Sequence, residues 1–438
     1  TADDVQQFLN ELAYGDTHPP PNATPQMRAD TLNQYKSSIS FYMPLRSLPW
    51  DNINNRGNPT MSDQVRNMIA AVRRKEVRGE GVSAKARRPI EFSEFMSLLI
   101  ALHIAYTNNV TVIHLMGAVL TTQWHIIGRI DEMMHLKFTN ICHSVNFPFA
   151  LIFRVTASKN IRTEHQLADQ LMLGSMNPLL CVLLNIAAYV EVVLDPGRDH
   201  ERQYLFGEGA DSRRSTRRVR GILDVLWGHF AFRRAMPGLL GTHSMRKGPA
   251  TYGSRFGIPR DYISRRGRWA GRRQPVDRYI DSTLPYPDAR AAQCLCLCGP
   301  EGAAGYMVKQ GASVPASFVE LITPHSRFFF GNEVARVLAY PLIWASFNND
   351  MTFADGDIKL LPQEFADRVR RLWHEASGST VCPVEKKRLL VSGVGDQLYI
   401  TPARRPPSPA AGAAAVGAGA DPADDEDEPP PLAPINPD

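Results

Sequence analysis

Residues 242–251 read Thr-His-Ser-Met-Arg-Lys-Gly-Pro-Ala-Thr, and this stretch constrains the fold more than any other. The segment 241–256, behind a Gly-rich start, is typical of a helix. Residues three apart share one face of a helix, so His243 and Arg246 are expected to act on the same bound group. His243 could also take part in proton transfer there.

Two further segments follow at short range. Residues 257–259 (Gly-Ile-Pro) precede Ile-Ser-Arg-Arg-Gly-Arg-Trp at 263–269, and 259–266 is predicted to be a short helix. Ten residues after Trp269, the segment Val-Asp-Arg-Tyr-Ile (276–280) is predicted to form another helical turn carrying Tyr279. An indole N–H at Trp269 could donate a hydrogen bond to a bound group, and an ordinary core tryptophan fits the same pattern.

Two segments lie upstream. Residues 128–137 read Gly-Arg-Ile-Asp-Glu-Met-Met-His-Leu-Lys, inside a helix predicted over 124–136. The apolar, β-rich stretch 147–156 predicts a strand, and 157–160 a turn that holds Lys159 before a return strand from Ile161. Taken alone, Gly-Arg-x-x-Glu predicts only an amphipathic helix with an ion pair.

In this order the segments resemble the tyrosine recombinase (phage integrase) family. The resemblance covers roughly residues 24–290. It implies that Arg129 is the first catalytic arginine, Glu132 the acid that supports the site, and Lys159 the general acid for the leaving 5′ oxygen.

The same resemblance assigns the later segments. His243 and Arg246 would form the His-x-x-Arg box, Trp269 would fill the family's His/Trp position, and Tyr279 would be the nucleophile. Tyr286 is the alternative nucleophile, whereas Tyr252 and Tyr262 precede Trp269 in helices that the family uses for packing.

The implied chemistry has a physical logic. Metal-free cleavage of a DNA strand needs a nucleophile, a proton donor and fixed cations around the phosphate, where negative charge concentrates in the transition state. The planar fork of arginine meets two phosphate oxygens at once. A covalent tyrosine–phosphate link conserves bond energy, so strands can be rejoined without ATP.

The predicted fold is mainly α with a small β-sheet. We expect a flexible N-terminal segment at 1–23, a helical DNA-clamp domain at 24–88 and a catalytic domain at 89–290. A helical C-terminal extension would follow at 291–401. The Pro-, Ala- and acid-rich composition of 402–438 predicts a disordered tail.

Charge is distributed unevenly along the 438 residues, whose formal net charge is +5. Positions 201–290 hold 19 Lys or Arg against 8 Asp or Glu, which favours a polyanionic partner, although a solvated basic face is the alternative. The arginine-rich run 213–220 also fits a nuclear-import signal. The cations expected to contact the DNA backbone are Arg73, Arg74, Lys75, Arg87, Arg88, Arg213, Arg214, Arg217, Arg218, Arg272 and Arg273.

Cysteine is sparse, and only Cys294, Cys296 and Cys298 cluster, at a spacing unlike that of paired zinc ligands. We therefore expect ordinary intracellular thiols and no metal site. The longest apolar run, 179–190, is too short to span a bilayer, and no signal peptide is recognisable, so the sequence predicts a soluble protein without a membrane partner.

The favoured interpretation is a site-specific recombinase that acts on double-stranded DNA, as a tetramer in the synapse, with no cofactor and no small-molecule substrate. The region after Tyr279 and the tail look most like eukaryotic mobile-element recombinases such as Cryptons, which implies a nuclear location. The alternative is a domesticated DNA-binding protein that no longer cuts. A relaxing, topoisomerase-like activity ranks third.

Overall fold

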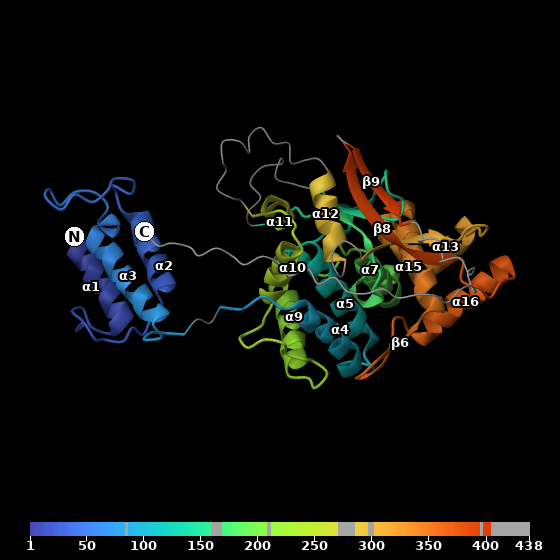
Figure 1. Cartoon of the computed structure of the whole chain (residues 1–438), viewed down its shortest axis with the longest axis horizontal. Coiled ribbons are helices and arrows are strands. Elements are labelled where there is room, and N and C mark those ends of the chain that lie inside the picture. Colours follow the sequence, from blue (N-terminus) through green and yellow to red (C-terminus); the bar gives the residue numbers. More distant parts are fainter. Residues whose placement is uncertain are drawn as a thin grey trace, which may run out of the picture.

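The computed structural model describes residues 1–83, 86–158, 169–207, 212–269, 285–296, 302–394 and 397–403. Figure 1 shows the N-terminal helices as a unit of their own, joined by a linker to a larger unit. The N-terminal helices are α1 (Ala2–Tyr14), α2 (Ala29–Tyr42) and α3 (Asp63–Val77).

The N-terminal unit has its own apolar core, which includes Leu9, Leu32 and Val72. Helix α1 begins with a capping box at Thr1 and packs its apolar face against α3. The expectation of a flexible segment at 1–23 is therefore wrong for α1. Ser62 caps the start of α3, because its hydroxyl accepts from the backbone N–H of Val65.

The larger unit starts with α4 (Phe92–Ala105) and α5 (Val110–His125), followed by the short α6 (Ile130–Met134). The single helix predicted over 124–136 is wrong, because the chain leaves the helical path between α5 and α6. Ile127 adopts a positive φ of 51° there. Gly128 follows, at a position with no room for a side chain, because a Cβ there would lie 2.8 Å from the Met133 side chain.

A three-stranded antiparallel sheet comes next, in the order β1 (Ile141–His143), β2 (Leu151–Arg154), β3 (Asp169–Met172). The predicted strand at 147–156 is confirmed for β2, which pairs Leu151 with Met172 and Arg154 with Asp169. Position 159, where the turn with the predicted lysine was expected, lies outside the described residues.

Helices then dominate up to the gap at 270–284. Helices α10 (Ser244–Arg255) and α11 (Arg260–Arg266) confirm the two helices predicted at 241–256 and 259–266, with ends that differ by no more than three residues. The elements in this part are β4 (Gly174–Ser175), α7 (Val182–Val193), α8 (Pro196–Asp199), α9 (Ser212–Trp227), α10 (Ser244–Arg255) and α11 (Arg260–Arg266).

The C-terminal region contains the expected helices and also strands that the sequence did not predict. Strands β5, β8 and β9 extend β4 into a second antiparallel sheet, in which Gly174 pairs with Ala304. One buried apolar cluster runs from Ile90 to Val384, so this region shares a core with the preceding one. Its elements are α12 (Pro285–Leu295), β5 (Ala303–Val308), α13 (Ala316–Ile322), α14 (Pro324–Phe330), α15 (Asn332–Phe347), β6 (Asp350–Phe353), β7 (Gly356–Lys359), α16 (Gln363–Ser377), β8 (Val384–Val394) and β9 (Gln397–Pro402).

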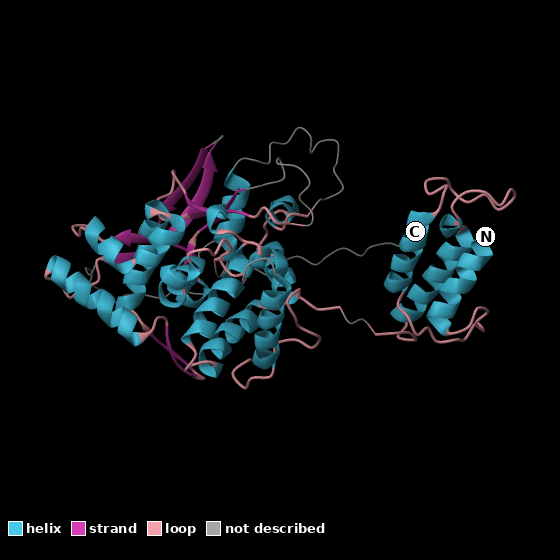
Figure 2. Ribbon diagram, turned by 180° about the vertical axis from the view of Figure 1, so that it is seen from behind, coloured by secondary structure: helices cyan, strands magenta, loops and turns pink. Residues whose placement is uncertain are grey.

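Helices make up most of the described chain, and the strands form small sheets (Figure 2). The predicted fold class, mainly α with a small β component, is confirmed. The tail beyond residue 403 lies outside the described residues.

Candidate active site

Three segments that are far apart in the sequence meet around one carboxylate. The start of α6 contributes Arg129 and Glu132, the start of α10 contributes Arg246, and the chain after α11 contributes Arg268. The side chain of Glu132 is only 2% exposed. The sequence-predicted Arg129, Glu132 and Arg246 are therefore brought together.

A buried glutamine ties two of these segments to each other. The Gln123 side-chain amide, on α5, donates to the Gly128 carbonyl at 3.1 Å and to the Thr242 carbonyl at 3.2 Å. The first carbonyl directly precedes Arg129, and the second directly precedes His243. The Gln123 side chain thus fixes the distance between the segment that carries Arg129 and the segment that carries His243.

The carboxylate of Glu132 is saturated with donors. Its Oε1 accepts from Nη1 of Arg129 at 2.9 Å and from the Ser158 hydroxyl at 2.7 Å. Its Oε2 accepts from the Arg129 backbone N–H at 2.8 Å, from Arg246 at 3.2 Å and from Arg268 at 2.7 Å. Each of these donors stabilises the ionised form.

Electrostatics keep this carboxylate charged. Burial alone would raise the pKa of Glu132, but the charge of Arg268, the Arg129 backbone N–H and the charge of Arg246 outweigh it and lower the pKa to about 2. The combined positive charge of Arg129, Arg246 and Arg268 exceeds the single negative charge of Glu132. The described surroundings of Glu132 therefore carry a net positive charge, which suits the binding of a further anion.

Arg246 is 5% exposed and points across the site from α10. Its guanidinium donates to the Ile127 carbonyl at 2.9 Å and to the Gly267 carbonyl. Burial lowers the pKa of Arg246 to about 10, against the attraction of Glu132, so the side chain stays charged at neutral pH.

Trp269 covers this guanidinium. Its ring lies 4.5 Å from the Arg246 guanidinium carbon, a cation–π distance, while the residue itself is 36% exposed. Gly267 leaves room for the ring, because a Cβ at that position would overlap it. The predicted Trp269 therefore joins the site by packing on Arg246 and still faces solvent.

His243 is the exposed residue that directly precedes α10. Partial burial lowers the pKa of His243, and the charges of Arg129, Lys247 and Arg220 lower it further. The imidazole is therefore neutral at pH 7 and able to accept a proton. Arg220, on α9, is a neighbour that the sequence analysis did not single out for this site.

Two predicted site residues, Lys159 and Tyr279, lie outside the described residues. The described chain stops at Ser158, which bonds Glu132, and at Trp269, and resumes at Pro285. The rival Tyr252 packs among aromatic rings, 5.7 Å from the Trp124 ring centroid. Tyr286 falls in the first turn of α12, where its side chain is not described.

Sequence reasoning missed Arg268 and Ser158. Both are adjacent to predicted residues, Trp269 and Lys159, but neither has a signal of its own, because an arginine or a serine beside a motif is ordinary. Only the folded chain brings both side chains onto Glu132.

The basic residues expected on DNA divide into two groups. Arg213, Arg214, Arg217 and Arg218 are exposed on α9, and Arg74 and Arg87 are exposed as well. By contrast, Arg88 forms a bidentate pair with the fully buried Glu94, both distances being 2.6 Å. Lys75 donates to the carbonyls of Pro21 and Ala23. Arg88 and Lys75 therefore have partners within the protein, and their contact with DNA stays a prediction. Arg272 and Arg273 lie outside the described residues.

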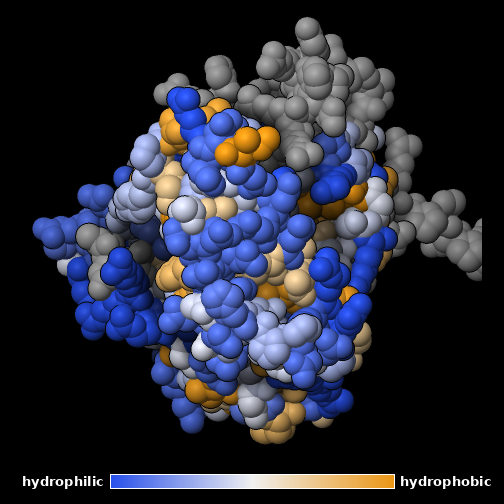
Figure 3. All heavy atoms as spheres, turned by 90° about the vertical axis from the view of Figure 1, so that its left-hand side faces the viewer, coloured by the Kyte–Doolittle hydropathy of each residue, from blue (hydrophilic) through white to orange (hydrophobic). Residues whose placement is uncertain are grey.

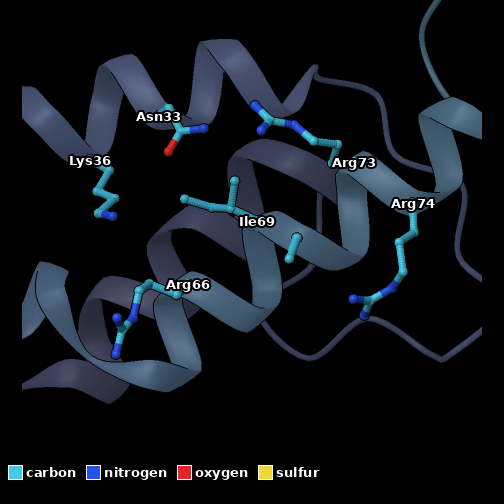
Figure 4. A pocket seen from close by; sticks show the side chains of 7 residues that line it. Asn33, Lys36, Arg66, Ile69, Arg73 and Arg74 are labelled. Atoms are coloured by element: carbon cyan, nitrogen blue, oxygen red, sulfur yellow. The ribbon is translucent and has the colours of Figure 1, made fainter. Parts of the chain in front are cut away.

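A pocket between α2 and α3 gathers cations on the N-terminal unit (Figure 4). Arg73 there pairs with Asp30 at 2.6 Å. Burial lowers the pKa of Lys36, and repulsion from Arg66 adds to this effect. In Figure 3, where this unit faces the viewer, most of its surface is hydrophilic. The lining residues are Asn33, Lys36, Arg66, Ile69, Ala70, Arg73 and Arg74.

Cys294 and Cys296 are poor metal ligands in this fold. Burial raises the pKa of Cys294 to about 12 and that of Cys296 well above its usual value, so both stay protonated. Within the described ranges, no three His, Cys, Asp or Glu side chains gather in a way that could hold a metal ion. Nor does any helix in these ranges have the length and apolarity to cross a membrane.

Comparisons with known proteins leave the family open. No family model matches the sequence, and no curated protein matches it. Among solved structures, the chain is similar to one described as "FLP Recombinase-Holliday Junction Complex I". The TM-score is 0.36 and the identity 12%, over 78% of this chain and 90% of that one. A likeness at this level does not assign the chain to a family.

Proposed function

We propose that this chain is a tyrosine-type DNA strand transferase that cleaves and rejoins DNA through a 3′-phosphotyrosyl intermediate at Tyr279. The observation that carries the proposal is that Arg129 and Arg246 meet at the buried Glu132, with His243 close enough to both arginines for their charges to lower its pKa. Segments that are far apart in the sequence meet there. They provide what phosphoryl transfer needs, namely fixed cations beside a neutral imidazole.

Each residue has a role in this scheme. Arg129 and Arg246 hold the non-bridging oxygens of the scissile phosphate, and Trp269 packs on Arg246. The neutral His243 accepts the proton of the Tyr279 hydroxyl as it attacks, and the bond from phosphorus to the 5′ oxygen breaks. Lys159 gives a proton to that oxygen. The bond from Ser158 to Glu132 supports this role, because Ser158 and Lys159 are consecutive.

We extend the proposal to the partners. The basic face of α9 and the cationic pocket of α2 and α3 bind the backbone of double-stranded DNA. The strand-exchange complex is a tetramer, and the activity serves integration and excision of a mobile element, of the Crypton type, in the nucleus. Exposed arginines lie on α9 and also on the N-terminal unit, which has an apolar core of its own. These cations support the proposal that the partner is DNA.

A suicide-substrate experiment tests the reaction. The purified full chain is incubated with a pool of duplexes of randomised sequence, each nicked near its centre so that the short 5′ fragment diffuses away. Tyrosine-linked DNA is then recovered under denaturing conditions. We expect a covalent complex for the wild type and none for Tyr279→Phe, with equal DNA binding by both.

The other outcomes are also decisive. A covalent complex that survives Tyr279→Phe would move the nucleophile to Tyr286, tested by Tyr286→Phe. Intact DNA binding without any covalent complex from the wild type would overturn the enzyme proposal in favour of a DNA-binding protein that does not cut.

A further inference from the structure

Arg268 combines two unfavourable features. Its backbone has φ 55°, in the left-handed region that side chains other than glycine rarely adopt. Its side chain is only 4% exposed, so a charge is removed from water. A position at which only the backbone turn mattered would favour glycine, as at Gly257, where φ is 74°.

Three hydrogen bonds of the Arg268 side chain point into the protein. The Arg268 guanidinium donates to the Ile126 carbonyl at 3.3 Å, to the Arg266 carbonyl at 2.9 Å and to Oε2 of Glu132 at 2.7 Å. The first carbonyl belongs to the turn between α5 and α6, and the second to the end of α11. Arg268 therefore links the segment before Arg129 to the segment that ends in Trp269.

Glu132 connects Arg268 to Arg129 and Arg246, the two residues that would contact the phosphate. The oxygen that accepts from Arg268 also accepts from Arg246, and the same carboxylate holds the Arg129 guanidinium. Without Arg268, this oxygen would keep only its longer contact to Arg246 and the Arg129 backbone N–H. The carboxylate would then be held less firmly, by Arg129, Ser158 and Arg246, and the two arginines would be less firmly fixed with it.

We propose that Arg268 is a positioning residue for the DNA cleavage reaction: by fixing Glu132, it aims Arg129 and Arg246 at the scissile phosphate and holds Trp269 over Arg246. Arg268 is too buried to contact the DNA itself. This role rests on the proposed function.

Three variants separate the positioning role from a purely structural one. Arg268→Gly keeps the left-handed backbone accessible but removes the guanidinium. Arg268→Lys keeps a charge but cannot reach two carbonyls and Glu132 together. The control, Arg255→Gln, removes an arginine of α10 that is 60% exposed and paired with Glu91 outside the site.

The readouts are the rate of covalent complex formation, the DNA dissociation constant and the pH profile of the rate. For Arg268→Gly we expect a rate about 100-fold lower, the loss that a misplacement of about 1 Å can cause, with DNA affinity within about 3-fold of the wild type. Its rate should also fall in acid at a higher pH than the wild-type rate, because Glu132 loses its nearest cation. Arg268→Lys should lie between the two, and Arg255→Gln should match the wild type.

The alternatives are distinguishable. If Arg268→Gly cleaves at the wild-type rate with an unchanged pH profile, the positioning role is overturned and the proposed function stands. If the wild type forms no covalent complex, the proposed function fails, and the role of Arg268 in cleavage falls with it. If Arg268→Gly does not fold, Arg268→Lys decides: slow cleavage at unchanged affinity supports the role, and wild-type cleavage overturns it.

Discussion

Glu132 is an ionised carboxylate sealed inside the protein, and the free energy of folding depends on its charge. Its pKa is about 2 in the folded chain, well below the ordinary value of 4.5. A depressed folded pKa contributes stability above the unfolded pKa, and this contribution is lost as the pH falls towards the folded pKa. The window is therefore between about pH 4.5 and pH 2.

We predict that Glu132→Gln destabilises the protein at pH 7 by about 3 kcal/mol, the equivalent of a pKa shift of this size, because three arginines lose their counter-charge. The difference from the wild type should shrink as the pH falls through that window. Urea unfolding between pH 3 and pH 7 measures it. Glu375→Gln on α16 is the control, since Glu375 forms an exposed pair with Arg371; a constant difference across the pH range would contradict the prediction.

At the scale of elements, the end of the interdomain linker runs along the start of α10. The Arg88 backbone N–H donates to the Leu239 carbonyl at 3.0 Å, and that of Ile90 to the Ser244 carbonyl at 3.3 Å. The Lys247 ammonium donates to the Arg87 carbonyl at 2.6 Å. The segment that carries His243 and Arg246 is thus held against the chain that leaves the N-terminal unit.

Gly248 makes this contact possible, and it yields a prediction with a matched control. A Cβ at Gly248 would lie 2.7 Å from the Ile90 carbonyl oxygen and 3.2 Å from the Trp124 ring. At Gly253, on the same helix, a Cβ would meet nothing closer than Ile263 at 3.6 Å.

We expect Gly248→Ala to lower the free energy of unfolding by about 1–3 kcal/mol, as overpacking does, and to slow cleavage by displacing α10. Gly253→Ala should instead be neutral or stabilising by up to roughly 1 kcal/mol, because alanine favours the helix. Thermal unfolding and covalent complex formation compare the two variants. Equal behaviour of both would show that the linker does not press on α10.

At the scale of the whole molecule, two basic surfaces lie on units with separate apolar cores. One is the exposed face of α9, and the other is the pocket of α2 and α3. Separate cores joined by a linker allow both surfaces to bind one duplex, each adding to the affinity of the other.

Salt dependence measures the two contributions. We predict that Arg217→Gln with Arg218→Gln, and separately Lys36→Gln with Arg74→Gln, each make the slope of log K against log salt shallower by about 0.9 per lost phosphate contact. The combined variant should show the sum. Arg336→Gln with Arg371→Gln, on the C-terminal helices, is the control, and an unchanged slope in either test pair would remove that surface from the DNA interface.

The sequence by itself determined the local features. The helix with His243 and Arg246, the strand around Leu151 and the cap at Ser62 follow from periodicity, β-propensity and capping chemistry, which act over a few residues. The order of the motifs also predicted that Arg129, Glu132 and Arg246 would meet. These signals survive in the sequence because neighbours in the chain generate them.

Only the tertiary structure decided the rest. The break at Ile127, the use of Arg88 and Lys75 as internal donors, the strands β5 and β8, and the place of Arg268 against Glu132 all depend on partners far away in the chain. A buried charge is stabilised by whichever donors surround it, and a strand by whichever edge it meets. The residues next to a buried charge or a strand in the sequence do not identify these distant donors and strand edges. Such features therefore appear only in the folded chain.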